Sequence, residues 1–223
     1  MGTGREFYEK EYHFNEDIEV IDQKRLQRFF KHVDFSRIRI SLDIGCGVGW
    51  ALKYCFSKGL RCIGSDISKK ALDLSRKVLN PAVKTVVADG EKLPFISDRF
   101  DLVFSLGSIE HFSSPDAGLA EIRRVTKRGG QILLVVPNSY WILNKLRLYK
   151  GTEQPQEMLA TLGEWVRFIR IHQIKVVNIG KDTGPKILKN RNPIGIIKRA
   201  LLKFTLTLPL SFSYQFILVC IRQ

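Results

Sequence analysis

The fold is decided by ten residues, Ser41 to Trp50, with the sequence SLDIGCGVGW. The first half is apolar enough for a buried strand, and the second half places glycine at alternate positions where a helix is expected to begin. Glycine permits positive φ angles and lets a ligand approach the backbone closely. The N–H groups of such a loop, with the helix N-terminus behind it, can bind a carboxylate or a phosphate. The segment therefore predicts a ligand-binding strand–loop–helix unit.

Strands and helices alternate around this loop. We expect strands over residues 38–44, 60–65, 83–88, 100–105, 131–136, 172–179 and 214–221. We expect helices from Asp17 to about residue 33, around 50–58, and over 68–79 and 116–125, while residues 138–170 are mostly helical in pattern. This alternation is typical of a parallel sheet with helices on both faces, so the predicted fold class is α/β.

A length of 223 residues fits a single domain. Hydrophobic residues at 44% and charged residues at 26% exclude a disordered chain, a collagen-like fibre and a disulfide scaffold. We divide the chain into an N-terminal helical cap (1–37), a ligand-binding core (38–137), insertions around the sixth strand (138–212) and a last strand (213–223).

The net charge of +14 is unevenly distributed, because residues 144–223 hold 14 basic and only 4 acidic residues. A solvated basic face explains this excess, and so does a phosphate-bearing or membrane partner. Within residues 186–204, basic and apolar side chains interleave at helical spacing. That pattern fits a lid helix packed on its own domain, and it also fits a peripheral contact with an anionic membrane.

The cysteines and the uncharged segments bear on location. The four cysteines contain no CxxC pair and do not cluster with the four histidines, so neither a metal site nor a disulfide framework is predicted. Reduced thiols and an N-terminus without an apolar signal region favour a cytoplasmic protein. Residues 204–221 are uncharged, and we interpret them as a loop leading into a buried strand rather than a membrane span.

The spacing of the glycines discriminates between ligands. A dinucleotide loop would be GxGxxG, but Trp50 stands where the third glycine belongs, and the Walker pattern is absent. Asp43, two residues before Gly45, suits a ligand that carries an ammonium group as well as a carboxylate. The amino-acid end of S-adenosylmethionine (SAM) fits that description.

These residues resemble motif I of the class I SAM-dependent methyltransferases, close to the type 11 family. Residues 63–68 resemble the second motif, 88–95 the third, 100–105 the fourth strand, and 121–130 the helix and turn before the fifth strand. The five segments follow in the family's order over about residues 38–137. The resemblance implies a Rossmann-like, seven-stranded sheet in the order 3-2-1-4-5-7-6, mostly parallel with the last strand antiparallel, and SAM as cofactor.

The resemblance also implies cofactor-binding residues: Asp43, Gly45, Cys46, Gly47, Gly49, Asp66, Ile67, Asp89, Gly90, Glu91, Ser105 and Tyr8. Asp66 would accept hydrogen bonds from the ribose hydroxyls, and it lies 23 residues after Asp43, near the spacing that such an acid has in a βαβ unit. The alternative for Asp66 is a helix cap. Asp89 would face the adenine amino group, or it is a turn carboxylate. Cys46 is a small packed residue rather than a nucleophile.

Tyr8 belongs to an aromatic N-terminal cluster, Phe7 to Phe14. In related enzymes such a segment often folds over the cofactor, and a tyrosine can touch its carboxylate. The alternative is a helix that packs on the sheet.

Catalytic groups are expected after the fourth strand, where Glu110 and His111 are the only titratable residues of segment 105–112. Either could act as a general base, or could hydrogen-bond the loop backbone instead. The motifs typical of amide, adenine and cytosine methylation are absent there, so O-, C- and N-methylation of a small-molecule or lipid-linked acceptor stay open. The charge keeps an RNA methyltransferase as an alternative, and a non-catalytic SAM-binding protein would share the same glycine loop.

Overall fold

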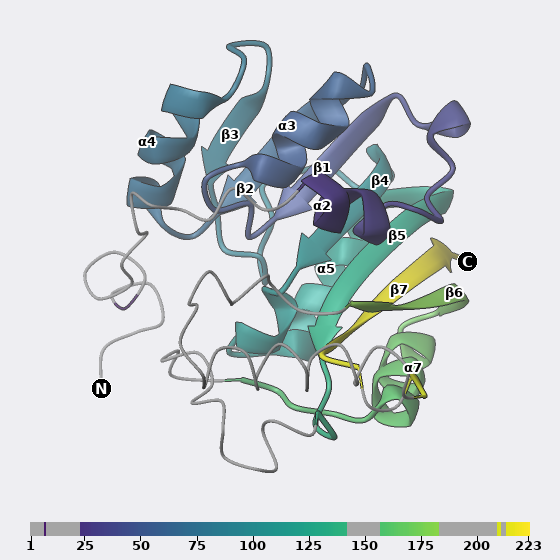
Figure 1. Ribbon diagram of the computed structural model, residues 1–223. Coiled ribbons are helices and arrows are strands. Elements are labelled where there is room, and N and C mark those ends of the chain that lie inside the picture. The colour runs from purple at the N-terminus through teal and green to yellow at the C-terminus, as the bar shows by residue number, and fades with distance from the viewer. Residues whose placement is uncertain (1–6, 8–22, 142–156, 183–208, 211–212) are drawn as a thin grey trace, which may run out of the picture.

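The computed structural model describes residues 7, 23–141, 157–182, 209–210 and 213–223. One seven-stranded sheet runs through this part of the chain in the order β3-β2-β1-β4-β5-β7-β6 (Figure 1). The strands are β1 (Ile40–Ile44), β2 (Arg61–Asp66), β3 (Lys84–Val87), β4 (Phe100–Leu106), β5 (Thr126–Pro137), β6 (Ile174–Asp182) and β7 (Gln215–Arg222). Strands β1 to β5 pair in parallel, whereas β7 is antiparallel to both β5 and β6.

Helices cover both faces of the sheet. One face carries α2 (Gln23–Phe29), α3 (Trp50–Ser57) and α4 (Lys69–Val78), and the other carries α5 (Pro115–Val125) and α7 (Leu162–Ile171). Two short 3-10 turns, η2 (Phe35–Arg37) and η3 (Ile109–His111), complete the described elements. Each face buries its own apolar cluster, because strand side chains point alternately to the two sides. The predicted α/β class, strand order and antiparallel last strand are confirmed.

The sequence also predicted several helix starts. Ser68 caps α4 by accepting a hydrogen bond from the Ala71 N–H, and Ser114 caps α5 in the same way, with Pro115 in the first turn. Serine is favoured at this position because its hydroxyl satisfies an N–H that has no partner inside the helix.

The fifth strand begins earlier than predicted, at Thr126 rather than at residue 131. Thr126 already pairs with Phe100, and the register then shifts before Gln131 pairs with Leu102. Gly129 adopts a φ of +71° within that irregularity. Gly129 and Gly130 therefore form a bulge in the strand rather than a turn before it.

The stretch predicted as mostly helical, 138–170, is described in part. It contains α7, whose N-terminus is closed by a reciprocal capping box between Thr161 and Glu164, but residues 157–160 are not helical. The expectations for Asp17, for residues 142–156 and for the basic segment 186–204 lie outside the described residues. Among the helices of the described part, none is long and apolar enough to cross a membrane.

The candidate site lies at one edge of the sheet, where the ends of several strands meet. The carboxyl ends of β1, β2 and β4 lie at that edge because these strands run parallel. Pro137 at the end of β5 pairs with Gln215, and Gln215 pairs with Asp182 at the end of β6. Residues as distant in sequence as Gly45 and Gln215 therefore share one edge of the sheet.

Candidate active site

The glycine loop between β1 and α3 has left-handed backbone at three positions. The φ angles are +73° at Gly45, +51° at Gly47 and +88° at Gly49, a region that other residues adopt at a cost. A Cβ on Gly45 would lie 2.3 Å from the Ser108 Oγ, and one on Gly49 would lie 2.8 Å from Leu79. A Cβ on Gly47 would meet no atom of the described residues within 4 Å, so this side of the glycine is open in that part of the chain.

The loop is held against the end of β2. The N–H groups of Gly45 and Cys46 both donate to the Ser65 carbonyl, at 2.8 and 3.0 Å. The Gly47 N–H donates to Asp66 Oδ2 at 2.7 Å, and the Ser68 N–H donates to Asp66 Oδ1 at 2.9 Å. The helix cap itself is Ser68. Asp66 therefore joins the glycine loop to the start of α4, with Ile67 half-buried between them.

Two carboxyl groups lie beneath this loop. Asp43 is 2% exposed, and burial together with the nearby Asp66 carboxylate raises its pKa well above the usual range. Because both groups favour a positive neighbour, the pair suits a ligand with a cationic end. The Cys46 thiol is buried, and burial raises its pKa, so it stays protonated and poorly nucleophilic.

The turn after β3 orders Asp89 locally. Its side chain is exposed and accepts the Glu91 N–H at 2.9 Å, which is the geometry of a turn carboxylate. Glu91 in turn accepts the Ser114 N–H at 3.1 Å, which ties this turn to the start of α5. Gly90 is buried, and a Cβ there would lie 2.3 Å from the Phe112 ring. A glycine is therefore needed at this position for packing.

Two polar groups at the end of β4 are buried without a hydrogen-bond partner among the described residues. They are the Ser105 hydroxyl and the Glu110 Oε2 atom. Glu110 is 3% exposed, and burial, reinforced by the Glu157 carboxylate, raises its pKa to about 8. His111 follows it in the same 3-10 turn and is half-buried.

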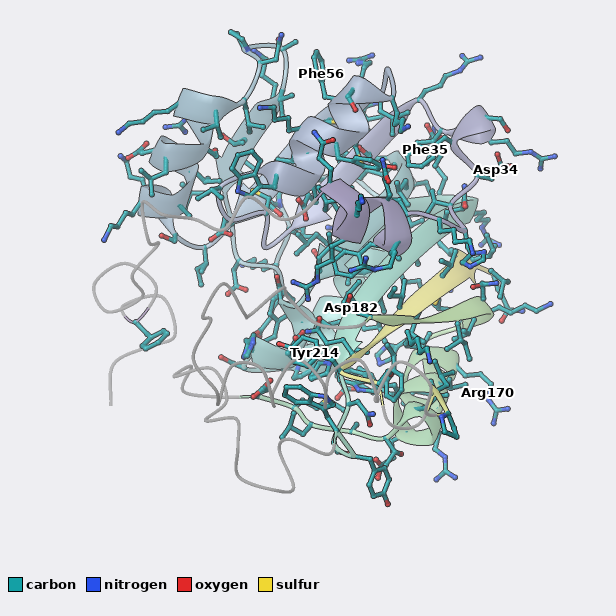
Figure 2. The ribbon with its side chains drawn as sticks, viewed as in Figure 1. Asp34, Phe35, Phe56, Arg170, Asp182 and Tyr214 are labelled. Carbon is teal, nitrogen blue, oxygen red and sulfur yellow. The ribbon has the colours of Figure 1, made fainter. Side chains whose placement is uncertain are left out.

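A second polar cluster at this edge was not predicted from the sequence. Arg25 on α2 donates from Nε and Nη2 to Asp182 Oδ2, at 3.0 and 2.7 Å, and from Nη2 to Gln215 Oε1 at 3.2 Å. Figure 2 shows Asp182 above Tyr214 at this end of the sheet. No motif could have signalled the cluster, because its members lie 157 and 190 residues apart in the chain.

These residues fit SAM. The open side of Gly47 admits a ligand, and the Asp43 and Asp66 pair favours its cationic end. Ser105 offers a hydroxyl that has no hydrogen-bond partner among the described residues. Tyr8 lies outside the described residues. No group of three potential metal ligands occurs within the described ranges.

A seven-stranded sheet with this order, a three-glycine loop after β1 and an acid at the end of β2 defines the class I SAM-dependent methyltransferase fold. Residues 42–134 match the family model described as a methyltransferase domain. Residues 42–134 therefore form a methyltransferase domain of type 11.

Individual relatives extend this picture. Tocopherol O-methyltransferase of Arabidopsis thaliana is 35% identical over 127 residues, which cover 54% of this chain and 35% of that protein. An uncharacterised protein of Methanocaldococcus jannaschii is 31% identical over 171 residues, covering 70% of this chain and 78% of that protein. The chain thus spans about a third of the plant enzyme's length.

Among solved structures, phosphoethanolamine N-methyltransferase 2 of Haemonchus contortus aligns with a TM-score of 0.73 and 17% identity. The alignment covers 100% of this chain and 60% of that one. At this identity the likeness shows a shared fold.

Proposed function

We propose that the protein transfers a methyl group from SAM to a small-molecule or lipid-linked acceptor. The observation that carries this proposal is the free side of Gly47 next to the Asp66 carboxylate, in a loop whose three glycines all have positive φ. In this proposal residues 38–137 bind the cofactor, and residues 138–212 contribute to the acceptor side of the single domain.

The chain's own residues position and shield the reactants. SAM supplies an activated methyl group on a sulfonium ion. Asp43 and Asp66 favour the cationic amino-acid end and the ribose hydroxyls, and the left-handed loop lets the ligand approach the backbone. The Glu110 carboxyl lies at the end of β4, where the acceptor would meet the methyl group. Glu110 is itself almost fully buried.

The test is calorimetric titration of S-adenosylhomocysteine into wild type, Asp66→Ala and the control Asp73→Ala. Asp73 is an exposed acid on α4 that pairs with Lys69 and Arg76, away from the loop. We expect Asp66→Ala to weaken binding by about 1.5–3 kcal/mol, the value of hydrogen bonds to a charged group, and Asp73→Ala to leave it unchanged. Absence of binding to wild type at millimolar ligand would refute the proposal.

The basic segment 186–204 supports a second proposal, a peripheral contact with anionic membrane that would bring a lipid-linked acceptor to the site. Flotation with phosphatidylcholine liposomes, with and without added phosphatidylserine, tests it. Flotation that does not depend on phosphatidylserine contradicts it.

A further inference from the structure

A small space beside Gly107 is bordered by two polar atoms from distant parts of the chain. Gly107 directly follows β4 and has a φ of +75°. A Cβ there would lie 3.7 Å from Glu110 Oε1 and 3.9 Å from Gln215 Nε2, with no other described atom within 4 Å. Among the described residues nothing else occupies this space, which lies at the strand end where methyl acceptors are expected.

The orientation of the Gln215 amide is fixed by its neighbour. Arg25 is a donor only, so the atom of Gln215 that faces it, 3.2 Å from Nη2, must be the carbonyl oxygen. The amide NH₂ group therefore points the other way, toward Gly107. Arg25 is itself fixed by two hydrogen bonds to the buried Asp182.

The second border of the space is the Glu110 carboxyl. It is almost fully buried, and its Oε2 has no hydrogen-bond partner among the described residues. Because burial raises its pKa to about 8, the group is mainly protonated at pH 7 and carries an O–H that can donate. With the proton on Oε1, the oxygen nearest Gly107, the carboxyl and the Gln215 amide both donate into one space.

The charge behind Gln215 is positive. Asp182 is approached by two arginines, Arg25 at 2.7 Å and Arg28 at 3.8 Å, which leaves this trio with one net positive charge. A carboxylate bound beside Gly107 would therefore meet two donors, with this positive charge on the Gln215 side and the Glu157 carboxylate acting on the Glu110 side. An ammonium group would find no acceptor on Gln215, whose amide oxygen is taken by Arg25.

We propose that the space between Glu110 and Gln215 is the acceptor subsite and that it takes a carboxylate, which the enzyme converts to its methyl ester. This inference rests on the proposed function. A lone pair of the carboxylate oxygen forms the O–CH₃ bond while the S–CH₃ bond breaks and its electron pair stays on sulfur. The negative carboxylate and the positive sulfonium become two neutral products, and no proton has to move. Gln215 is a binding residue in this scheme, and Arg25 is a positioning residue.

The binding test uses three probes with the same chain, hexanoate, hexanol and hexylamine, by saturation-transfer NMR at pH 7 with saturating S-adenosylhomocysteine. We expect hexanoate to bind most tightly, and Gln215→Leu to weaken it about tenfold or more, because a hydrogen bond to a charged group is lost. Gln215→Glu still accepts from Arg25 but presents an acceptor to the probe, so it should weaken hexanoate binding at least as much as Gln215→Leu does. Glu110→Gln keeps a donor and should retain binding. The control is Gln27→Leu, an exposed glutamine on α2.

Three results would overturn the inference. They are hexylamine binding as tightly as hexanoate, hexanoate binding that is unchanged in both Gln215 variants, and no hexanoate binding at millimolar concentration.

A second measurement identifies the product class without knowing the acceptor. The enzyme is incubated with methyl-tritiated SAM and a metabolite extract, and the products are treated with mild alkali. Methyl esters release volatile tritiated methanol, whereas methyl ethers and N-methyl groups do not. We expect volatile label from wild type and its loss in Gln215→Leu. Label that is stable to alkali overturns the carboxylate inference alone, whereas failure to bind S-adenosylhomocysteine overturns the proposed function with it.

Discussion

The substitution Gly47→Ala tests the contribution of the glycine loop to ligand binding apart from its contribution to stability. The φ of +51° lies in the left-handed α region, and a Cβ would meet no described atom within 4 Å. For an alanine, left-handed backbone costs about 1–2 kcal/mol, and the stiffer unfolded chain returns about 0.4–1 kcal/mol. We expect Gly47→Ala to lower the free energy of unfolding by about 1 kcal/mol. Its methyl group would occupy the space where we propose that the cofactor binds, so S-adenosylhomocysteine should bind at least about tenfold more weakly.

The matched control is Gly59→Ala. Gly59 follows α3, has a φ of +83°, and a Cβ there would likewise meet nothing within 4 Å. Urea unfolding should show a loss of about 1 kcal/mol here too, while calorimetry shows unchanged ligand affinity. Gly45→Ala should destabilise more than either, because its Cβ would overlap Ser108. Wild-type affinity in Gly47→Ala would refute the assignment of this loop to the cofactor.

Other parts of the structure give further tests. Because the folded protein holds the Glu110 proton up to a pKa of about 8, against 4.5 for an ordinary glutamate, its contribution to stability falls as pH rises between these values. We therefore expect the free energy of unfolding of Glu110→Gln, measured with urea from pH 5 to 8.5, to increase relative to that of wild type as pH rises. The total change should be at most roughly 5 kcal/mol. A constant difference would contradict this. Arg222 is buried, and it donates to the half-exposed Asp98 and to two backbone carbonyls, so Arg222→Met should destabilise by about 1–3 kcal/mol without changing cofactor affinity. Thr161→Ala removes the capping box of α7 and should cost about 1 kcal/mol in thermal unfolding. A melting temperature equal to that of wild type would show that this cap contributes nothing.

The geometry of the glycine loop, where we propose that the cofactor binds, could be predicted from sequence because its determinants are local. Three glycines at alternate positions, with Asp43 just before them, predict a strand, a left-handed loop and the start of a helix within ten residues. Asp66 follows the next strand, and parallel pairing of β1 with β2 brings it to the loop. Contacts that depend on the direction of a side chain could not be predicted from the sequence. Glu91, for example, is tied to the start of α5 through Ser114, a contact that no local pattern predicts.

The part of the site where we propose that the methyl acceptor binds could not be predicted from sequence, because its properties arise from contacts between distant segments. Glu110 stands out in the sequence only as a titratable residue after the fourth strand. Its burial depends on the fold around it, including residue Met158, whose N–H donates to its carbonyl at 2.8 Å. The same carboxyl would be an ordinary ionised base on an exposed turn, but buried it is an acid at neutral pH.

The direction of Gln215 depends on contacts that are more distant still. Its partner Arg25 lies 190 residues earlier in the chain, and Asp182, which fixes that arginine, lies on a third element. The antiparallel last strand makes the meeting geometrically natural, because it starts at the edge where the parallel strands end. A parallel β7 would place its first residue at the opposite edge, and the donor beside Gly107 would be lost. The antiparallel direction of β7 thus has a specific consequence in this chain. It places the Gln215 amide, a hydrogen-bond donor, at the site where we propose that the methyl acceptor binds.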